Sequence, residues 1–234
     1  YQSYFGRINY NYDGKYLLEF NLRRDGSSKF GPGNRYAYFP SASGGWRISE
    51  EAFMANIPWL SNLKVRGSWG ITGNDRIGNY IYEQTYNANL DYVLGNDINV
   101  GGVALTGLSN PNIRWEEVEQ FDIGFDASFF KSKLQITGDY YERKSSDILY
   151  NNFPIPSTIG TTNLPAQNAA SMVNKGIELA INYRDNIGGL SYTIGGNFTK
   201  FLSNEVTGLG DGGEETISGA TIIRIGDPLR SYYG

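Results

Sequence analysis

Carboxylates are the residues of this sequence that come nearest to a catalytic or metal-binding set. Histidine and cysteine are absent from the 234 residues, which removes the commonest metal ligand, the usual general base near neutral pH and every thiol. Glu116, Glu117 and Glu119 resemble a glycosidase pair. However, Glu117 and Glu119 share one face of an extended chain, whereas hydrolysis needs two carboxyls that flank a bond. We interpret them as structural charge near a strand end and expect no catalytic residue.

An acidic, glycine-rich segment near the C-terminus contains two further patterns. Three carboxylates there offer oxygen ligands for Ca²⁺: Asp211, Glu214 and Glu215. Their spacing fits no EF-hand, so we favour an exposed acidic loop. Three glycines match G-x-G-x-x-G: Gly208, Gly210 and Gly213. A dinucleotide site requires a following helix, but the next residues, EETISGATIIRIG, have the pattern of strand and turn. We expect neither a cofactor nor a metal.

Charged and aromatic residues also gather near the ends of expected strands. The charged group consists of Arg23, Arg24 and Asp25. We expect it to form an electrostatic latch with a neighbouring strand, with direct ligand contact as the alternative. The aromatic group is in the longest expected loop: Tyr80, Tyr82, Tyr86 and Tyr92. Such rings can stack on sugar faces or pack against neighbouring loops, and the substrate-binding residues stay unknown.

These residues lie between segments in which apolar and polar side chains alternate. In KYLLEFNLRRDGSSKFG, residues 15–31, every second residue from Tyr16 to Leu22 is apolar. A strand with this pattern has one apolar face and one polar face. We predict eight strands: 4–12, 15–25, 36–48, 63–71, 119–129, 134–142, 176–183 and 191–199. Several have about ten residues, close to what a tilted strand needs to cross a bilayer.

The expected connections alternate between compact and long. The compact ones are Asp13–Gly14, a helical turn or so within 49–60, 131–133 and 185–189; the long ones are 26–35, 72–114, 147–174 and the segment from 201 onward. Aromatic residues flank the compact turns. Short turns on one rim, long loops on the other and an aromatic belt are typical of an outer-membrane barrel. We therefore expect Phe121, Ile123 and Phe125 to face lipid and Asp122 to face a lumen.

Composition restricts the alternatives. Net charge is −4 without a basic block, which argues against nucleic acid as a partner. No run approaches the roughly 18 apolar residues of a membrane helix, and mean hydropathy is −0.41. Both ends have strand-like sequence, so we expect a piece of a longer protein. Two alternatives stay open: a self-contained eight-stranded barrel with a structural or adhesive role, and a soluble carbohydrate-binding sandwich.

Several stretches resemble SusC/RagA-type TonB-linked outer-membrane transporters. They are RRDGSSKFGPGNRYAYFPSASGGWRISEEAF at 23–53, LKVRGSWGITGND at 63–75, the stretch NPNIRWEEVEQFDIGFDASFFKSKLQITGDYYERKSSDIL that begins at Asn110, NKGIELAINY at 174–183 and GDPLRSYYG at 226–234. Each stretch alone is weak. Together they span nearly the whole chain in the family's order.

The resemblance implies an all-β fold, an antiparallel up-and-down transmembrane β-barrel of about 22 strands with a plug in its lumen. Residues 1–234 would be a fragment of that one barrel domain, about eight strands from its C-terminal half, without the plug and N-terminal domains. The family implies a non-enzymatic importer of oligosaccharides or peptides in the outer membrane of a Gram-negative cell. Its implied partners are a SusD-like surface lipoprotein, the TonB complex and outer-membrane lipid.

Overall fold

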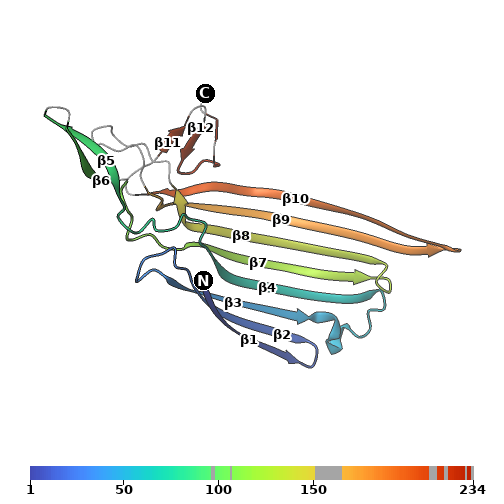
Figure 1. Ribbon diagram of the computed structural model, residues 1–234. Helices are drawn as coiled ribbons and strands as arrows, with labels where there is room; N and C mark the ends of the chain where they lie inside the picture. Colours follow the sequence, from blue (N-terminus) through green and yellow to red (C-terminus); the bar gives the residue numbers. More distant parts are fainter. Residues whose placement is uncertain are drawn as a thin grey trace.

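Eight strands form one antiparallel sheet with the order β1-β2-β3-β4-β7-β8-β9-β10 (Figure 1). The computed structural model describes residues 1–95, 98–105, 107–150, 165–210, 215–218, 221–229 and 231–232. The strands of this main sheet are β1 (Gln2–Tyr12), β2 (Tyr16–Gly26), β3 (Tyr36–Arg47), β4 (Leu60–Asn74), β7 (Glu116–Phe129), β8 (Leu134–Tyr150), β9 (Gln167–Ile187) and β10 (Leu190–Leu209). All eight predicted strands are confirmed, in the predicted sequence order.

Two small sheets lie at one end of the main sheet (Figure 1). A hairpin forms from β5 (Tyr86–Leu94) and β6 (Ile98–Leu105), and a three-stranded sheet from β11 (Glu215–Ser218), β12 (Thr221–Arg224) and β13 (Ser231–Tyr232). The β5–β6 hairpin lies within the expected excursion 72–114, for which the sequence reading named no strand. The expected helical turn is present as two short 3₁₀ helices, η1 (Ile48–Glu50) and η2 (Ala52–Met54).

The strands are longer than their alternation predicts. β9 covers Gln167–Ile187, whereas the prediction covered only 176–183, and β8 continues to Tyr150. The expected loop 147–174 is therefore wrong at both ends. The reason is that polar and apolar residues do not alternate regularly in residues 143–150 and 167–175, while backbone pairing continues there through two register shifts. Pro165 precedes β9, and Pro154 and Pro156 lie outside the described residues.

β3 contains a proline although it lies inside the sheet. Pro40 lacks a backbone N–H, and the ladder between β3 and β4 begins only at the next residue, Ser41. Beyond that point the ring of Phe39 occupies the space where a side chain at Gly73 would lie. The Phe39 ring therefore lies over Gly73 of β4 at this end of the sheet.

Compact and long connections lie at opposite ends of the main sheet, as predicted. The turn end has residues 13–15, 48–59, 130–133 and 188–189. The loop end has 27–35 and the ends of 75–115, and there β8 ends at Tyr150 and β9 begins at Gln167. Asp13 and Gly14 have positive φ of 53° and 65° and lie in the three-residue connection between the paired Tyr12 and Tyr16, where the Lys15 N–H donates to the Tyr12 carbonyl. Because strand direction reverses at each connection, every long loop comes to one rim.

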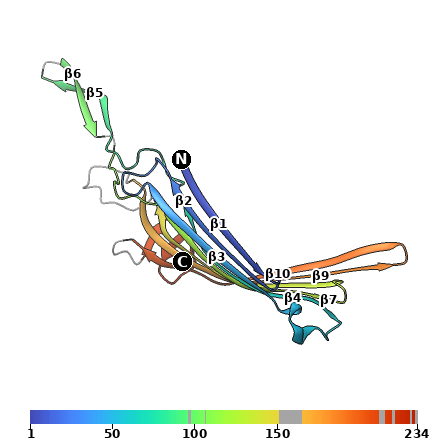
Figure 2. The same cartoon turned by 90° about the horizontal axis from the view of Figure 1, so that it is seen from below.

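The main sheet is strongly twisted, and it is open (Figure 2). β1 and β10 are its two edges, so among the described residues the eight strands do not close on themselves. This argues against a self-contained eight-stranded barrel. A sandwich would require a second sheet over the apolar face, and the two small sheets lie at the loop end instead (Figure 1).

Candidate functional site

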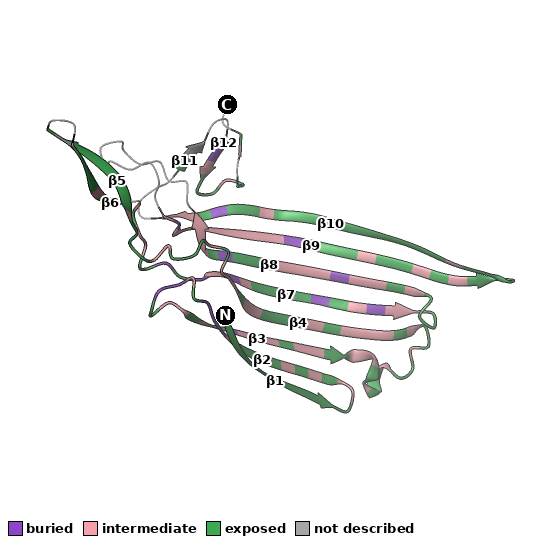
Figure 3. Cartoon of the chain, in the orientation of Figure 1, coloured by how far each residue is buried: buried purple, intermediate pink, exposed green. Residues whose placement is uncertain are grey.

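One face of the main sheet is apolar across all its strands. Strand registry aligns two neighbouring rows on this apolar face. One row is Leu18, Gly44, Gly67, Ile123, Tyr140, Ile177 and Lys200; the other is Tyr16, Trp46, Val65, Phe125, Gly138, Leu179 and Phe198. Exposed segments recur along the strands (Figure 3), and Phe121, Ile123 and Phe125 are 45%, 47% and 39% exposed. A continuous exposed apolar surface of this extent is larger than a soluble protein ordinarily presents to water.

The apolar band crosses the strands obliquely. On β2 the first charged residue of this face towards the loop end is Arg24. On β10 it is Lys200, which is in register with Leu18, six residues before Arg24. Towards the turn end, the last tyrosine of this face is Tyr16 on β2 and Tyr192 on β10, six residues before the residue in register with Tyr16. Six residues of rise over six strand spacings correspond to a tilt of about 35°, within the range of membrane barrels.

The opposite, polar face is organised around Arg66 on β4. Its guanidinium lies 3.2 Å from Asp122, 3.2 Å from Asp126 and 2.6 Å from Asp139. Gly124 leaves the space for this cluster, because a Cβ there would collide with the Asp139 carboxylate and lie 2.7 Å from the Gly138 carbonyl. Sequence reasoning missed this cluster, since only the strand register brings one arginine to three aspartates.

An open hollow of about 670 Å³ lies on the same polar face. Polar side chains at its lining include Arg7, Glu19, Asn21, Arg23, Ser41, Ser68 and Gln120. Such a surface can hold water or a polar ligand through hydrogen bonds rather than through covalent chemistry. We take this polar face, with the loops at its rim, as the candidate functional site.

The structure separates the three glutamates that resemble a glycosidase pair. Registry places Glu117 and Glu119 on the apolar side of β7, and Glu119 accepts a hydrogen bond of 2.7 Å from the Trp69 indole. Glu116 accepts a hydrogen bond from the backbone N–H of Leu149. These contacts agree with the structural interpretation, because each of Glu116 and Glu119 fixes a neighbouring strand.

The charged group on β2 is divided between the two faces. Asp25 is fully buried and binds Arg23 at 2.7 Å, while Ser3 of β1 donates a 2.5 Å hydrogen bond to it. The expected latch to a neighbouring strand therefore exists through Ser3, although the ion pair itself is within β2. Arg24 points to the other face, where its guanidinium lies over the rings of Tyr36 and Tyr38, 4.2 and 5.7 Å from their centroids.

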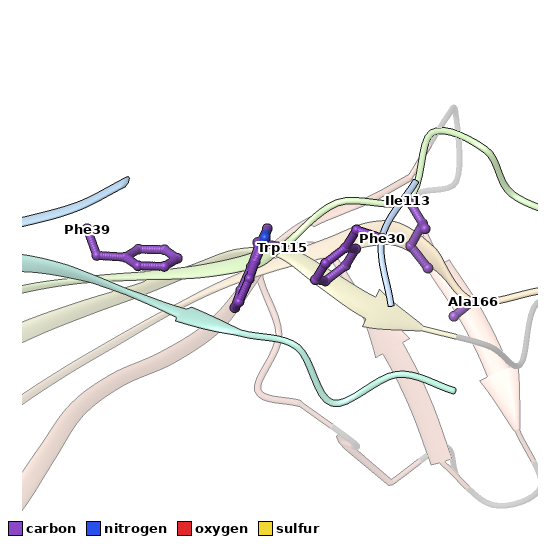
Figure 4. Packing of buried hydrophobic residues seen from close by; sticks show 5 residues of the cluster. All are labelled: Phe30, Phe39, Ile113, Trp115 and Ala166. Carbon is purple, nitrogen blue, oxygen red and sulfur yellow. The ribbon is translucent and has the colours of Figure 1, made fainter. Parts of the chain in front are cut away.

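The base of the long loops is held by a small hydrophobic core (Figure 4). Its buried residues are Phe30, Phe39, Ile113, Trp115 and Ala166. The Trp115 ring centroid lies 5.0 Å from that of Phe30 and 5.5 Å from that of Phe39. Ser27 also donates a 2.9 Å hydrogen bond to Asp75. Sequence reasoning missed this core, although isolated aromatics inside polar loops, such as Phe30, were a usable signal.

A polar network fixes the same loop base from the other side. Arg114 forms two hydrogen bonds with Asp147, of 2.9 and 2.5 Å, and these raise the pKa of its guanidinium. Asn168 accepts from the backbone N–H of Arg114 and donates to the carbonyls of Arg114 and Asp147. The returning end of loop 75–115 is thereby bound to β8 and β9.

The four loop tyrosines do not form one site. Tyr82 packs against the core at the loop base, whereas Tyr80, Tyr86 and Tyr92 are 62%, 64% and 67% exposed. Tyr86 and Tyr92 belong to the β5–β6 hairpin, which projects from the rim in both views (Figures 1 and 2). Sequence reasoning missed this hairpin, although Gly95-Asn96-Asp97 between two β-prone runs is a turn signal.

The C-terminal glycine and acidic patterns also separate. Gly208 lies at the end of β10, and Gly210 just after it has a φ of 64°. Gly213, Asp211 and Glu214 lie outside the described residues. Glu215 begins β11, so a strand follows the glycines and the rejection of a dinucleotide site stands. Over the described ranges, no group of three carboxylates is suited to hold a metal ion, and no helix is long and apolar enough to span a membrane.

Comparison with known proteins connects this geometry to a family. Residues 1–227 match the family model described as TonB dependent receptor-like, beta-barrel. TonB-dependent receptor P3 of Formosa agariphila is 36% identical over 99% of this chain, and TonB-dependent receptor SusC of Bacteroides thetaiotaomicron is 36% identical over 92%. This chain covers 24% and 21% of those two proteins.

Solved structures give the same result. The RagAB peptide transporter matches 98% of this chain with a TM-score of 0.85 and 31% identity, and the 'open-open' state of the RagAB peptide importer matches 98% with a TM-score of 0.86 and 31% identity. The chain spans 25% and 24% of those chains. About a quarter of each relative thus corresponds to the sheet and loops described above.

Proposed function

This chain belongs to the TonB-dependent receptor-like β-barrel family, and we propose that it forms wall and outer loops of a SusC/RagA-type nutrient importer in the outer membrane. In this proposal residues 1–234 are a fragment of one barrel domain whose remaining strands extend the sheet from β1 and β10. The apolar face contacts lipid and the polar face lines a lumen. The chain acts by shaping a passage and carries out no covalent step.

The oblique apolar band is the observation that carries the proposal. A single sheet with an exposed apolar face is unstable in water, because that face must be covered. In a bilayer every backbone group must be paired, which a closed barrel of tilted strands achieves. The band's slope of about 35° is what such a barrel requires of a bilayer-facing band. A soluble sandwich has no reason for an uncovered band at this angle.

The loop end provides the surface that we assign to capture of the nutrient. The small core around Trp115 fixes the base of the loops, while the β5–β6 hairpin presents exposed Tyr86, Tyr92 and Val103. An exposed apolar surface of this kind is typical of an interaction site. We assign its contact to a SusD-like surface lipoprotein that closes over the loops.

Oligosaccharides or peptides are the proposed cargo. One relative carries the name SusC, and the RagAB neighbours are described as a peptide transporter. Both cargo classes are polar and can be held by amide, hydroxyl and charged groups such as those on the polar face. Energy would come from the TonB complex acting on a plug, through parts of the protein beyond this chain.

The experiment uses cells with and without the full receptor gene and follows uptake of labelled oligosaccharide and peptide mixtures. The proposal expects uptake of one mixture that depends on the receptor and stops when the proton gradient is removed. Co-purification of a surface lipoprotein with the receptor would support the partner assignment. Identical uptake without the gene, together with a receptor located outside the outer membrane, would contradict the proposal.

A further inference from the structure

We propose that Arg24 binds the phosphate of an outer-leaflet lipid headgroup, an inference that rests on the proposed membrane location of the sheet. Arg24 is the first charged residue beyond the apolar band on β2, after Leu22. It lies at the loop end, which is the extracellular rim of an outer-membrane barrel. Tyr4 on β1 and Tyr38 on β3 are its direct cross-strand partners. Tyrosine at this level is typical of the headgroup layer.

The charge of Arg24 is fixed in place but not neutralised. Its guanidinium lies 4.2 Å from the centroid of the Tyr36 ring and 5.7 Å from that of Tyr38, and over the described part of the chain it forms no ion pair. Its Nε is buried without an acceptor. The next residue along the strand, Arg23, differs in this respect, since its Nε lies 2.7 Å from the buried Asp25. Of these two neighbouring cations, only Arg24 retains an unused charge.

The surrounding rings are positioned without any ligand. A side chain at Gly26 would collide with the Tyr36 ring, so this glycine allows the ring to lie across β2. Tyr36 donates a 3.0 Å hydrogen bond to Gln2, and Gln2 donates a 2.5 Å hydrogen bond to the Tyr4 hydroxyl. Because the two tyrosines are connected through Gln2, a bound headgroup would meet a preorganised site.

Phosphate is the chemical group that this site suits. Arginine presents a planar fork that matches phosphate and also stacks on aromatic rings. Lipid phosphates lie at the headgroup level, beside the outward end of β2, whereas a transported ligand would meet the polar face. Two lysines further along the same border, Lys144 and Lys175, are less suited because both pair with Glu142, at 3.4 and 3.1 Å.

The test uses the full-length receptor purified from outer membranes in detergent, as wild type, Arg24→Gln, Arg24→Lys and the control Arg143→Gln. Arg143 is an exposed arginine on the polar face of β8. Native mass spectrometry would follow binding of two probes, lipid A with two phosphates and dephosphorylated lipid A. Wild type should prefer the phosphorylated probe, and R24Q should lose roughly tenfold in affinity for it. R24K should lose less, and R143Q should match wild type.

Two results would overturn the inference: equal affinity of wild type for both probes, or an R24Q affinity equal to that of wild type. If R24Q does not assemble, the wild-type comparison of the two probes and the R24K variant decide the question. Outer-membrane fractionation and heat-modifiable gel migration of wild type are checked first. Failure of those checks contradicts the proposed membrane location, whereas normal assembly with no phosphate preference contradicts the lipid site alone.

Discussion

The two faces of the main sheet are built from the same strands, but their side chains are packed differently. Around Ile123 the apolar face carries aromatic and aliphatic side chains together with Gly67 and Gly138, and its large side chains remain well exposed. Around Arg66 the polar face joins four charged residues from β4, β7 and β8 within 3.2 Å. Ile123 and Asp122 are neighbours in the chain, so a single residue step separates the two environments.

This difference shows where each face obtains its cohesion. Side chains on the polar face bind one another, so a change at one position disturbs several partners. Side chains on the apolar face touch their neighbours loosely and, in the proposed barrel, complete their contacts with lipid. The polar face should therefore tolerate neutral polar changes and resist added volume, while the apolar face should tolerate added volume and resist charge.

Of the changes considered, a charge placed on the apolar face should impair assembly most strongly. Ile123→Arg places a cation near the middle of the lipid-facing band, at a cost of about 2–4 kcal/mol, and should block assembly of the full receptor. Asp122→Asn, one residue away on the polar face, should assemble normally. Heat-modifiable migration of receptor from outer-membrane fractions measures both. If D122N failed and I123R assembled, the two faces would be exchanged.

Added side-chain volume should have the opposite preference, with a larger cost on the polar face than on the apolar face. Gly124→Ala on the polar face meets the Asp139 carboxylate and the Gly138 backbone, and overpacking of this kind costs about 1–3 kcal/mol. Gly138→Ala on the apolar face meets only the ring of Phe125, which can move into lipid, so its cost should be smaller. Gly196→Ala, with no atom near its Cβ, is the control.

The temperature at which the folded band disappears on a gel ranks these three glycine variants. We expect G124A to melt lowest, G138A to melt between G124A and wild type, and G196A to match wild type. If G124A and G196A lost the folded band at the same temperature, the Arg66 cluster would accommodate an added methyl group. That result would contradict tight packing of the polar face.

A smaller effect is expected where the apolar band ends at the turns. Glu51 accepts hydrogen bonds from the Tyr16 hydroxyl at 2.7 Å and the Trp46 indole at 3.0 Å, and these bonds lower its pKa. A lowered pKa adds stability above the ordinary glutamate range that is lost as pH falls through the folded-state pKa. After correction for the intrinsic pH dependence of amide exchange, the protection of residues 48–57 should therefore fall as pH drops below the ordinary glutamate range.

Glu51→Gln should remove that acid-dependent step, because the amide does not titrate, and Glu50→Gln should keep it. The comparison is made within one segment at each pH, so general acid effects on the receptor cancel. An identical pH profile for E51Q and wild type would contradict the assigned role of Glu51 in holding η1 and η2 against the hairpin turn.

The strands of the main sheet were predictable because alternation is a local property. Ile123 and Asp122 already differ in the sequence, and a strand must place them on opposite faces. The tight turn at Asp13–Gly14 was predictable for the same reason, since its residue types favour positive φ. Strand ends were less predictable, because β8 and β9 continue into segments without regular alternation, where pairing is set by the neighbouring strand.

The contacts within the candidate site depended on information that the sequence alone lacks. Arg66 meets Asp139 only because β4, β7 and β8 adopt one register, and register is not visible along a single chain. The packing of Phe30 on Trp115 likewise joins two loops that are far apart in the sequence. The slope of the apolar band also became measurable only after the strands were aligned.

Site-directed spin labelling tests the central claim most directly, and residues 1–234 contribute no cysteine that would compete with an introduced label. Labels at positions 120–123, 125 and 126 of the membrane-embedded receptor are compared for contact with oxygen, which dissolves in lipid, and with a water-soluble nickel reagent. We predict oxygen contact at 121, 123 and 125 and water contact at 120, 122 and 126. Loss of the alternation, or labels at 121, 123 and 125 shielded from both reagents, would contradict the assignment of this face to lipid.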